Sequence, residues 1–351
     1  MNHSATENTE ITKALCPYFG NCGGCSFQDK PYAEQLEIKR KLVENELSPL
    51  MLEEVFEIKP VIPSPEIYHY RHMISMTVKC REGRLRLGFM GNDHRVFLPI
   101  ERCMIADERL NQYLPTALSR LEALPPKRKF GTNQTALRIG DSGEVMAGLK
   151  EDAKKILMCD VAGKKFSYAM SSFFQHNFSI LPAMAGAIRS LLNPSGEEIL
   201  YDLYCGVGLF GILLADCYAS VYGIEEGYES IRQAKENAKE NRIENISFTE
   251  GKVEDLLYQI VGAGFKPAPT TVGQTIHIIV DPPRAGLKPK VIEEFLKVKI
   301  DRFIYVSCGL DVLRRDLGLL REGFQIKAVQ PIDLFPQTKQ IENIVLLEAR
   351  T

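Results

Sequence analysis

Two polar side chains in the C-terminal half of the chain directly follow apolar runs that are expected to form strands. Asp281 follows the run at 276–280 and begins the sequence Asp-Pro-Pro-Arg, and Cys308 follows the run at 302–307. The carboxyl ends of parallel strands meet at one edge of a sheet, where ligands bind. Buried cysteines on strands are usually inert. A thiol at a strand end, just ahead of a helix expected at 311–320, should instead have a lowered pKa and act as a nucleophile.

A glycine-rich turn follows a third apolar run, at 198–204. Gly206, Gly208 and Gly211 let the backbone turn tightly and approach a ligand, and Glu225 follows the run at 220–224, where an acid can meet ribose hydroxyls. These features fit a nicotinamide dinucleotide as well as S-adenosylmethionine. Asp202 precedes the glycines in a D-x-x-C-G-x-G pattern, which is similar to the first motif of class I methyltransferases. We therefore expect S-adenosylmethionine rather than a dinucleotide or a turn without a ligand.

Three of the nine cysteines lie close together near the N-terminus. Cys16, Cys22 and Cys25 share a short loop that contains two glycines. In a reducing compartment, closely spaced thiols indicate metal binding rather than disulfides. Three near ligands and one distant ligand suit either zinc or a four-iron cluster, and the spacing alone does not choose between them.

The elements that position these residues alternate between strand and helix. Apolar runs at 198–204, 220–224, 276–280 and 302–307 predict strands, and residues 209–216 and 229–242 predict helices between them. This alternation predicts an α/β fold, a Rossmann-like doubly wound sheet over residues 179–351. Residues 261–275, which are rich in glycine and proline, predict a surface loop.

Two segments precede the doubly wound sheet. Residues 51–178 are expected to be mainly β, with strands at 73–79, 85–90 and 96–100. Residues 1–50 hold the three close cysteines and then a helix at 31–47. The apolar positions that recur in this helix are Leu36, Leu42, Val43 and Leu47.

Composition limits the class of protein. The chain has 351 residues, of which 45% are hydrophobic and 25% charged, as in ordinary globular proteins. No apolar run approaches the roughly 18–20 residues of a membrane span, and the first residues are polar, so we expect a cytoplasmic protein. The net charge of −2 gives no general attraction to nucleic acid, so any such contact must come from a local basic face.

Three motifs together resemble the RNA uridine-5-methyltransferases, which are class I and S-adenosylmethionine-dependent. They are the Asp281–Gly286 sequence Asp-Pro-Pro-Arg-Ala-Gly, Ser307-Cys308 with Arg315-Asp316-Leu317, and Phe335-Pro336-Gln337-Thr338 with Glu342. Their order and spacing match that family across the C-terminal region. The sequence Ser-Phe-Phe-Gln that ends at Gln175 is also similar to the family's sequence at the start of the cofactor domain.

The resemblance implies a role for each matching residue. Cys308 is the nucleophile that adds to C6 of uracil, Glu342 is the general base that removes the C5 proton, and Asp281 faces the uracil or the cofactor. The cofactor contacts that the resemblance implies are Gln175, Asp202, Tyr204, Gly206, Gly208, Glu225 and Asp281. One departure is Gln340, where the family usually has a histidine, so a proton relay at that position is not expected.

The segment from Cys16 to Gln28 resembles the iron–sulfur branch of this family. The resemblance implies a [4Fe–4S] cluster held by Cys16, Cys22, Cys25 and a fourth cysteine after the β region. Cys103 fits that place better than Cys80 or Cys159. Methyl transfer needs no redox step, so we expect a structural or RNA-positioning role for the cluster.

The RNA substrate follows from the branch. Members with the cluster and without an N-terminal oligonucleotide-binding barrel mostly act on 23S ribosomal RNA, which is the first substrate we expect, with transfer RNA next. A non-catalytic RNA-binding protein and a nicotinamide oxidoreductase are the alternatives, and neither a membrane nor an obligate protein partner is implied. The candidate basic positions for RNA are Arg71, Lys79, Arg81, Arg84, Arg86 and Lys127-Arg128-Lys129.

Overall fold

The computed structural model describes residues 14–81, 83–123, 134–141, 143, 145–147, 152–261, 275–298 and 300–350. The basic run at 127–129 and most of the predicted loop at 261–275 lie outside these residues. Within the described ranges, no helix is both long and apolar enough to cross a membrane.

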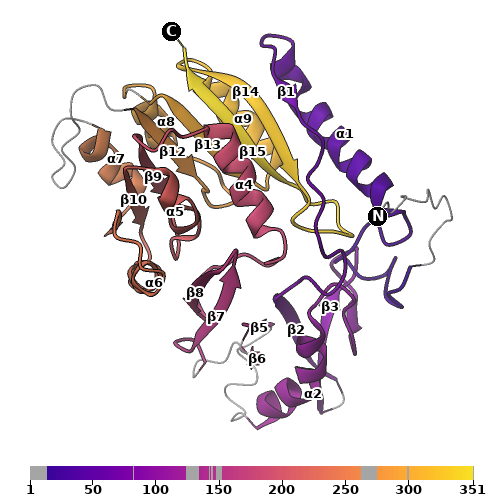
Figure 1. Ribbon diagram of the computed structural model, residues 1–351. Helices are drawn as coiled ribbons and strands as arrows, with labels where there is room; N and C mark the ends of the chain where they lie inside the picture. The colour runs from indigo at the N-terminus through magenta and orange to yellow at the C-terminus, as the bar shows by residue number, and fades with distance from the viewer. Residues whose placement is uncertain are drawn as a thin grey trace, which may run out of the picture.

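A mixed eight-stranded sheet organises the C-terminal half and confirms the predicted α/β class (Figure 1). Its strand order is β1-β14-β15-β13-β12-β9-β10-β11, and only β15 runs antiparallel to its neighbours. The strands are β1 (Glu57–Ile58), β9 (Ile199–Leu203), β10 (Ser220–Glu225), β11 (Ile246–Glu250), β12 (Ile276–Val280), β13 (Arg302–Ser307), β14 (Phe324–Ile332) and β15 (Glu342–Ala349).

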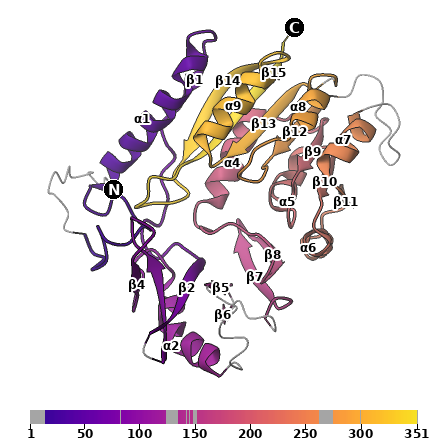
Figure 2. The ribbon, with the colours of Figure 1, turned by 180° about the vertical axis from the view of Figure 1, so that it is seen from behind.

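Helices cover both faces of this sheet, as the front and back views show (Figures 1 and 2). One face carries α1 (Tyr32–Met51), α7 (Val253–Val261), α8 (Pro289–Phe295) and α9 (Leu310–Leu320). The other carries α4 (Leu181–Leu192), α5 (Leu209–Leu214) with the 3-10 turn η1 (Ala215–Cys217), and α6 (Tyr228–Glu240). Two apolar cores result, and they meet at the sheet.

The region between α1 and α4 is mainly β, with one helix that the sequence analysis did not predict. A five-stranded antiparallel sheet has the order β4-β3-β2-β5-β6, and a separate hairpin pairs β7 with β8. The unpredicted helix is α2 (Glu108–Glu122), whose N-cap Asp107 accepts a hydrogen bond from the Arg109 amide at 2.9 Å. The strands are β2 (Met73–Arg81), β3 (Arg84–Met90), β4 (Phe97–Pro99), β5 (Gln134–Ile139), β6 (Val145–Ala147), β7 (Ile156–Val161) and β8 (Lys164–Ala169).

The buried face of α1 includes only part of the apolar series in its sequence. Leu42, a member of that series, is 37% exposed. The buried positions recur every three to four residues and include two polar side chains: they are Gln35, Lys39, Val43, Leu47 and Leu50. Gln35 and Lys39 have polar partners inside the protein, which the apolar pattern could not reveal.

Candidate active site

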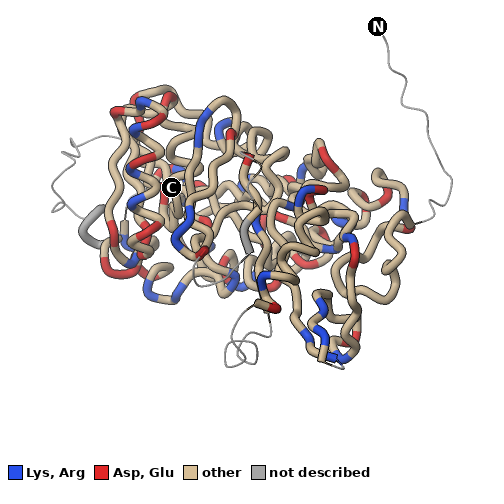
Figure 3. The backbone as a smooth tube through the Cα atoms, turned by 90° about the horizontal axis from the view of Figure 1, so that it is seen from below, with Lys and Arg blue, Asp and Glu red and all other residues tan. Residues whose placement is uncertain are grey.

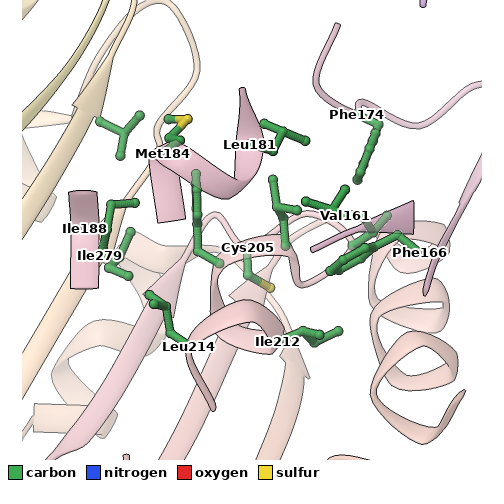
Figure 4. Close-up of a cluster of buried hydrophobic side chains, with 14 of the residues drawn as sticks. Val161, Phe166, Phe174, Leu181, Met184, Ile188, Cys205, Ile212, Leu214 and Ile279 are labelled. Carbon is green, nitrogen blue, oxygen red and sulfur yellow. The ribbon is translucent and has the colours of Figure 1, made fainter. Parts of the chain in front are cut away.

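The cofactor loop leaves the sheet at the end of β9. Tyr204 and Gly208 have positive φ angles of 61° and 86°, so the chain turns sharply before α5. A side chain at Gly208 would also meet the Phe248 ring at 2.8 Å, and only glycine fits there. The thiol of Cys205, between these residues, is buried among Ile212, Leu214 and other apolar side chains (Figure 4). The buried Cys205 therefore anchors the loop in the apolar core, and the backbone of the loop lies at the sheet edge.

Two carboxylates fix this loop. Asp202 Oδ2 accepts a hydrogen bond from the Gly211 amide at 2.8 Å, while its Oδ1 is buried and lacks a hydrogen-bond partner within the described chain. Burial, together with the charges of Asp281 and Glu225, raises the pKa of Asp202 to about 7. Glu225 accepts from the amides of Gly206 at 3.3 Å and Gly227 at 2.8 Å, which ties the ends of β9 and β10 together.

Asp281 lies at the same edge, directly after β12. Its Oδ2 is 3.5 Å from the donating Nε2 of Gln175, a residue that precedes it by more than a hundred positions. Burial raises the pKa of Asp281 to about 7. The fold thus brings together Gln175, Asp202, Glu225 and Asp281, which the sequence had placed in one site.

Cys308 and Glu342 meet across two antiparallel strands. Ser307, the last residue of β13, pairs with Asn343 of β15. Cys308 directly follows Ser307, and Glu342 directly precedes Asn343. Because the strands are antiparallel, Cys308 and Glu342 therefore come next to each other. Glu342 is only 6% exposed, and it is the first residue of β15. Glu342 is therefore not a solvated carboxylate, and it lies at the same sheet edge as the thiol.

The pKa of the Cys308 thiol is shifted in the opposite direction from the prediction. Burial raises the pKa of Cys308, the charges of Glu342 and Asp281 raise it further, and Arg284 lowers it. The expected lowering of the thiol pKa by the following helix was wrong, because burial and two neighbouring carboxylates outweigh the helix terminus. Burial and the charge of Asp281 also raise the pKa of Glu342 well above its usual value, against Arg284.

Arg284 is thus a member of the site whose role the sequence analysis did not assign. It is the cation that acts on both Cys308 and Glu342. The signal was present in the Asp-Pro-Pro-Arg motif, where the sequence analysis assigned a role to Asp281 alone. Gln340, by contrast, is exposed, and its backbone amide donates to Thr338 Oγ1 at 3.1 Å.

Four cysteines line one cavity between the N-terminal loop and the five-stranded sheet. The cavity has a volume of about 300 Å³, and Cys16, Cys22, Cys25 and Cys103 all line it. Burial raises the pKa of Cys25 to about 12, and the charges of the other three cysteines add to this. The cavity does not include Cys80, which is exposed on β2, or Cys159, which is buried on β7.

The same cysteines do not form a single-ion site. Among the described residues, no group of three His, Cys, Asp or Glu side chains is arranged to hold one metal ion. The sulfurs around a tetrahedral zinc ion would lie only about 3.8 Å apart. A four-iron cluster places each thiolate on a different iron and so needs a wider arrangement.

The predicted basic positions on β2 and β3 form one exposed face. Lys79 pairs with Arg86, and Arg81 pairs with Arg84, across the hairpin. Alternate residues of a strand point to the same side, so these four exposed cations share a face. We call Lys79, Arg81, Arg84 and Arg86 the basic hairpin face. Elsewhere both signs of charge are interspersed along the chain (Figure 3), in keeping with the small net charge.

The chain is similar to known proteins along nearly its whole length. The family described as tRNA (Uracil-5-)-methyltransferase matches residues 147–350. A tRNA (uracil(54)-C(5))-methyltransferase of Schizosaccharomyces pombe is 30% identical, over 98% of this chain and 67% of that protein. An uncharacterized RNA methyltransferase of Listeria monocytogenes is 29% identical, over 100% of this chain and 86% of its own length. The crystal structure of Pyrococcus abyssi tRNA (uracil-54, C5)-methyltransferase with S-adenosyl-L-homocysteine has the same fold, with a TM-score of 0.69 at 24% identity, over 92% of this chain and 85% of that one.

Proposed function

Because the chain belongs to the tRNA (uracil-5-)-methyltransferase family, it is an S-adenosylmethionine-dependent enzyme that methylates C5 of uracil in RNA, and we propose that it does so through a covalent bond between Cys308 and C6 of the target uracil. The observation that carries this proposal is the opposition of Cys308 and Glu342 at the ends of β13 and β15. A nucleophile and a base on adjacent strands can act on neighbouring carbons of one ring.

The thiol makes an unreactive carbon reactive. C5 of uracil is a poor nucleophile, and adding the Cys308 sulfur to C6 gives C5 the character of an enolate carbon. The cofactor, when bound, supplies an electrophilic methyl group to that carbon. Cys308 must lose its proton before it adds, and Arg284 is the neighbouring group that favours the thiolate. The raised pKa also makes the thiolate, once formed, a stronger nucleophile.

Glu342 completes the reaction. After methylation, C5 carries both a methyl group and a proton, and the C6–S bond remains. The Glu342 carboxylate removes the C5 proton, the electron pair restores the C5–C6 double bond, and the C6–S bond breaks to release Cys308. A carboxylate whose pKa is raised by burial is a stronger base than an exposed one, which suits this step.

Seven residues of the cofactor edge fit S-adenosylmethionine. Asp202 Oδ1, which has no hydrogen-bond partner among the described residues, and the closely packed turn at Gly208 leave a polar atom and exposed backbone for a ligand. Glu225 lies where ribose hydroxyls are bound in such sheets, and Gln175 contacts Asp281 beside it. We assign cofactor contacts to these five residues together with Tyr204 and Gly206.

We further propose that Cys16, Cys22, Cys25 and Cys103 hold a [4Fe–4S] cluster. Their shared cavity supports this choice. Residues 1–50 then form the cluster segment, 51–178 a β-rich RNA-binding domain that supplies Cys103, and 179–351 the methyltransferase domain. The cluster would join the first two parts, which is a structural role.

The substrate is transfer RNA or 23S ribosomal RNA. The name of the fission yeast relative, which specifies uracil 54 of tRNA, favours transfer RNA. The four gathered cysteines favour 23S ribosomal RNA, since the sequence resemblance links the cluster branch to that substrate. In either case the basic hairpin face is the proposed contact with phosphates. Like charges directly opposite each other destabilise a hairpin, and a bound polyanion would offset this.

The test is methyl transfer from labelled S-adenosylmethionine to unmodified tRNA transcripts and, separately, to unmodified 23S ribosomal RNA. Nucleoside analysis should find the label in 5-methyluridine of one RNA. Label in both RNAs at equal rates would refute a single substrate class. Label in neither, with protein that retains its iron, would refute both proposed substrates.

A further inference from the structure

Two buried polar side chains on α1 reach across the molecule to the loop that precedes Glu342. Lys39 is 0% exposed and Gln35 is 1% exposed. Lysine is almost never fully buried unless it is paired. Both have partners between β14 and β15, about three hundred positions later in the chain. Gln35 Nε2 also donates to the carbonyls of Phe27 at 3.1 Å and Lys30 at 3.0 Å.

Lys39 binds the start of this loop. Its Nζ donates to Asp333 Oδ1 at 2.5 Å and to the Phe335 carbonyl at 2.9 Å. The other oxygen of Asp333 accepts a hydrogen bond from the hydroxyl of Tyr32 at 2.9 Å. Tyr32 lies about two helical turns before Lys39 on α1. All polar atoms of the Asp333 carboxylate are therefore held by α1.

Gln35 binds the middle of the loop through both ends of its amide. Its Nε2 donates to Gln337 Oε1 at 3.0 Å, and its Oε1 accepts from the Gln337 backbone amide at 3.1 Å. Gln337 has a φ of 68°, a strained conformation that its surroundings must maintain. Its carbonyl accepts from the amides of Ser26 and Phe27, directly after Cys25.

We propose that Gln35, Lys39, Asp333 and Gln337 form a clamp that positions Glu342 for proton removal. Residues 333–338 are buried without belonging to a helix or strand, so hydrogen bonds hold their path. Those of the clamp act together with bonds from Tyr70 to the Pro336 carbonyl and from Asn177 to the Leu334 carbonyl. The loop ends where Glu342 pairs with Ile332 across the first step of the β14–β15 ladder. The inference rests on the proposed role of Glu342 as the base.

Stability alone does not account for the clamp. Apolar side chains of similar volume often replace a buried ion pair without loss of stability, whereas a buried pair can fix one arrangement among several. Here the buried pair fixes the path of the loop that leads to Glu342, the proposed base. Lys39 and Gln35 are thus positioning residues that act through the loop and touch neither RNA nor cofactor.

The test compares two steps of the reaction in iron-loaded full-length protein. The variants are Lys39→Met with Asp333→Asn, which removes the ion pair without leaving a lone charge, and Gln35→Met. With labelled S-adenosylmethionine and the tRNA and 23S transcripts, the covalent RNA adduct should form at nearly the wild-type rate. Its resolution to 5-methyluridine should be about 10- to 100-fold slower, as expected for a displaced catalytic group.

Glu46→Gln is the matched control. Glu46 also lies on α1 and bridges to Arg314 of α9 at 2.7 Å, but neither residue belongs to the loop and both are partly exposed. The control should resolve the adduct at the wild-type rate. The clamp would be overturned if its variants slowed adduct formation and adduct resolution equally. It would also be overturned if folded clamp variants resolved the adduct at the wild-type rate.

Hydrogen exchange separates this inference from the proposed function. The amides of residues 333–341 should exchange faster in the clamp variants than in the wild type and in Glu46→Gln, without any RNA. If wild-type protein forms no adduct, the covalent mechanism fails, and unchanged exchange in the loop would independently refute the clamp.

Discussion

Burial raises the pKa of the Cys308 thiol, and the carboxylate of Glu342, at the start of the adjacent strand, raises it further. The two groups therefore oppose each other's ionisation in the free protein. In the proposed reaction they are never needed as anions at the same moment. Cys308 is an anion before it adds to the ring, and Glu342 must be an anion only after the sulfur is bound to carbon.

Replacing Cys308 with serine should abolish both the covalent RNA adduct and methylation, by at least about a thousandfold. A hydroxyl at this position is far less nucleophilic than a thiolate. Denaturing gels and nucleoside analysis measure the two outcomes. Cys80→Ser, which changes an exposed thiol on β2, is the control and should remain active. Methylation by Cys308→Ser at the wild-type rate would refute covalent catalysis.

Glu342→Gln should form the adduct but release it about 10²- to 10⁴-fold more slowly, because an amide cannot accept the C5 proton. Quenched time courses of adduct and 5-methyluridine measure the two steps. Glu348→Gln, a partly exposed position on the same strand, should leave both steps unchanged. Rapid release by Glu342→Gln would assign the base elsewhere.

Asp202→Asn should stabilise the protein at high pH. The pKa of Asp202 is raised to about 7, so the folded protein keeps a proton that the unfolded chain has already lost near pH 5.5. Wild-type stability therefore falls as the pH rises toward 7, by about 2 kcal/mol from this group, and the asparagine variant escapes that loss. Urea unfolding at pH 5.5 and pH 8, without cofactor, measures the difference.

Asp93→Asn is the control for this titration. Asp93 is exposed, and its pKa is lowered by hydrogen bonds from the Arg95 and Val96 amides, so it is ionised throughout this pH range. Its effect on stability should be the same at both pH values. A pH-independent effect of Asp202→Asn would show that Asp202 ionises normally in the fold.

Anaerobically purified protein should contain about four irons per chain, and Cys103→Ala should lose most of them. Cys80→Ala should keep the wild-type iron content, because Cys80 lies outside the cysteine cavity. Iron analysis and the visible absorption of the cluster measure this. Stoichiometric zinc in place of iron would overturn the cluster assignment.

Replacing Lys79 and Arg86 with glutamine should weaken RNA binding and reduce its salt dependence. Each lost phosphate contact lowers the slope of log affinity against log salt concentration by about 0.7–0.9. Filter binding at several salt concentrations measures the slope. The control pair, Lys290→Gln with Lys327→Gln, changes exposed cations away from the hairpin and should leave the slope unchanged.

The strands of the methyltransferase sheet could be predicted where apolar residues run without interruption. The bounds expected for β12 and β13 match the structure, and β9 is one residue shorter at each end than expected. β14 was missed because Gln325, Lys327 and Gln330 interrupt its apolar pattern. β1 has only two residues, too few to leave a periodic signal.

The contents of the site were predicted better than its electrostatics. Motifs identified Cys308 and Glu342, but the direction of the thiol pKa depends on which charges fold against it, and no local pattern encodes that. The pairing of Lys39 with Asp333 was unpredictable for the same reason, since the two residues lie 294 positions apart. In α1 the lysine simply interrupts an apolar face.

That distance has a consequence for protein synthesis. A chain emerges from the ribosome from its N-terminus, and its early parts fold first. α1 is therefore made long before the loop that Gln35 binds, 302 residues later. A nascent chain that has reached the end of α9 already carries the cofactor loop and Cys308, yet it lacks the strand that holds Glu342. The sheet edge that joins the thiol to the carboxylate is therefore complete only when translation has added the last two strands.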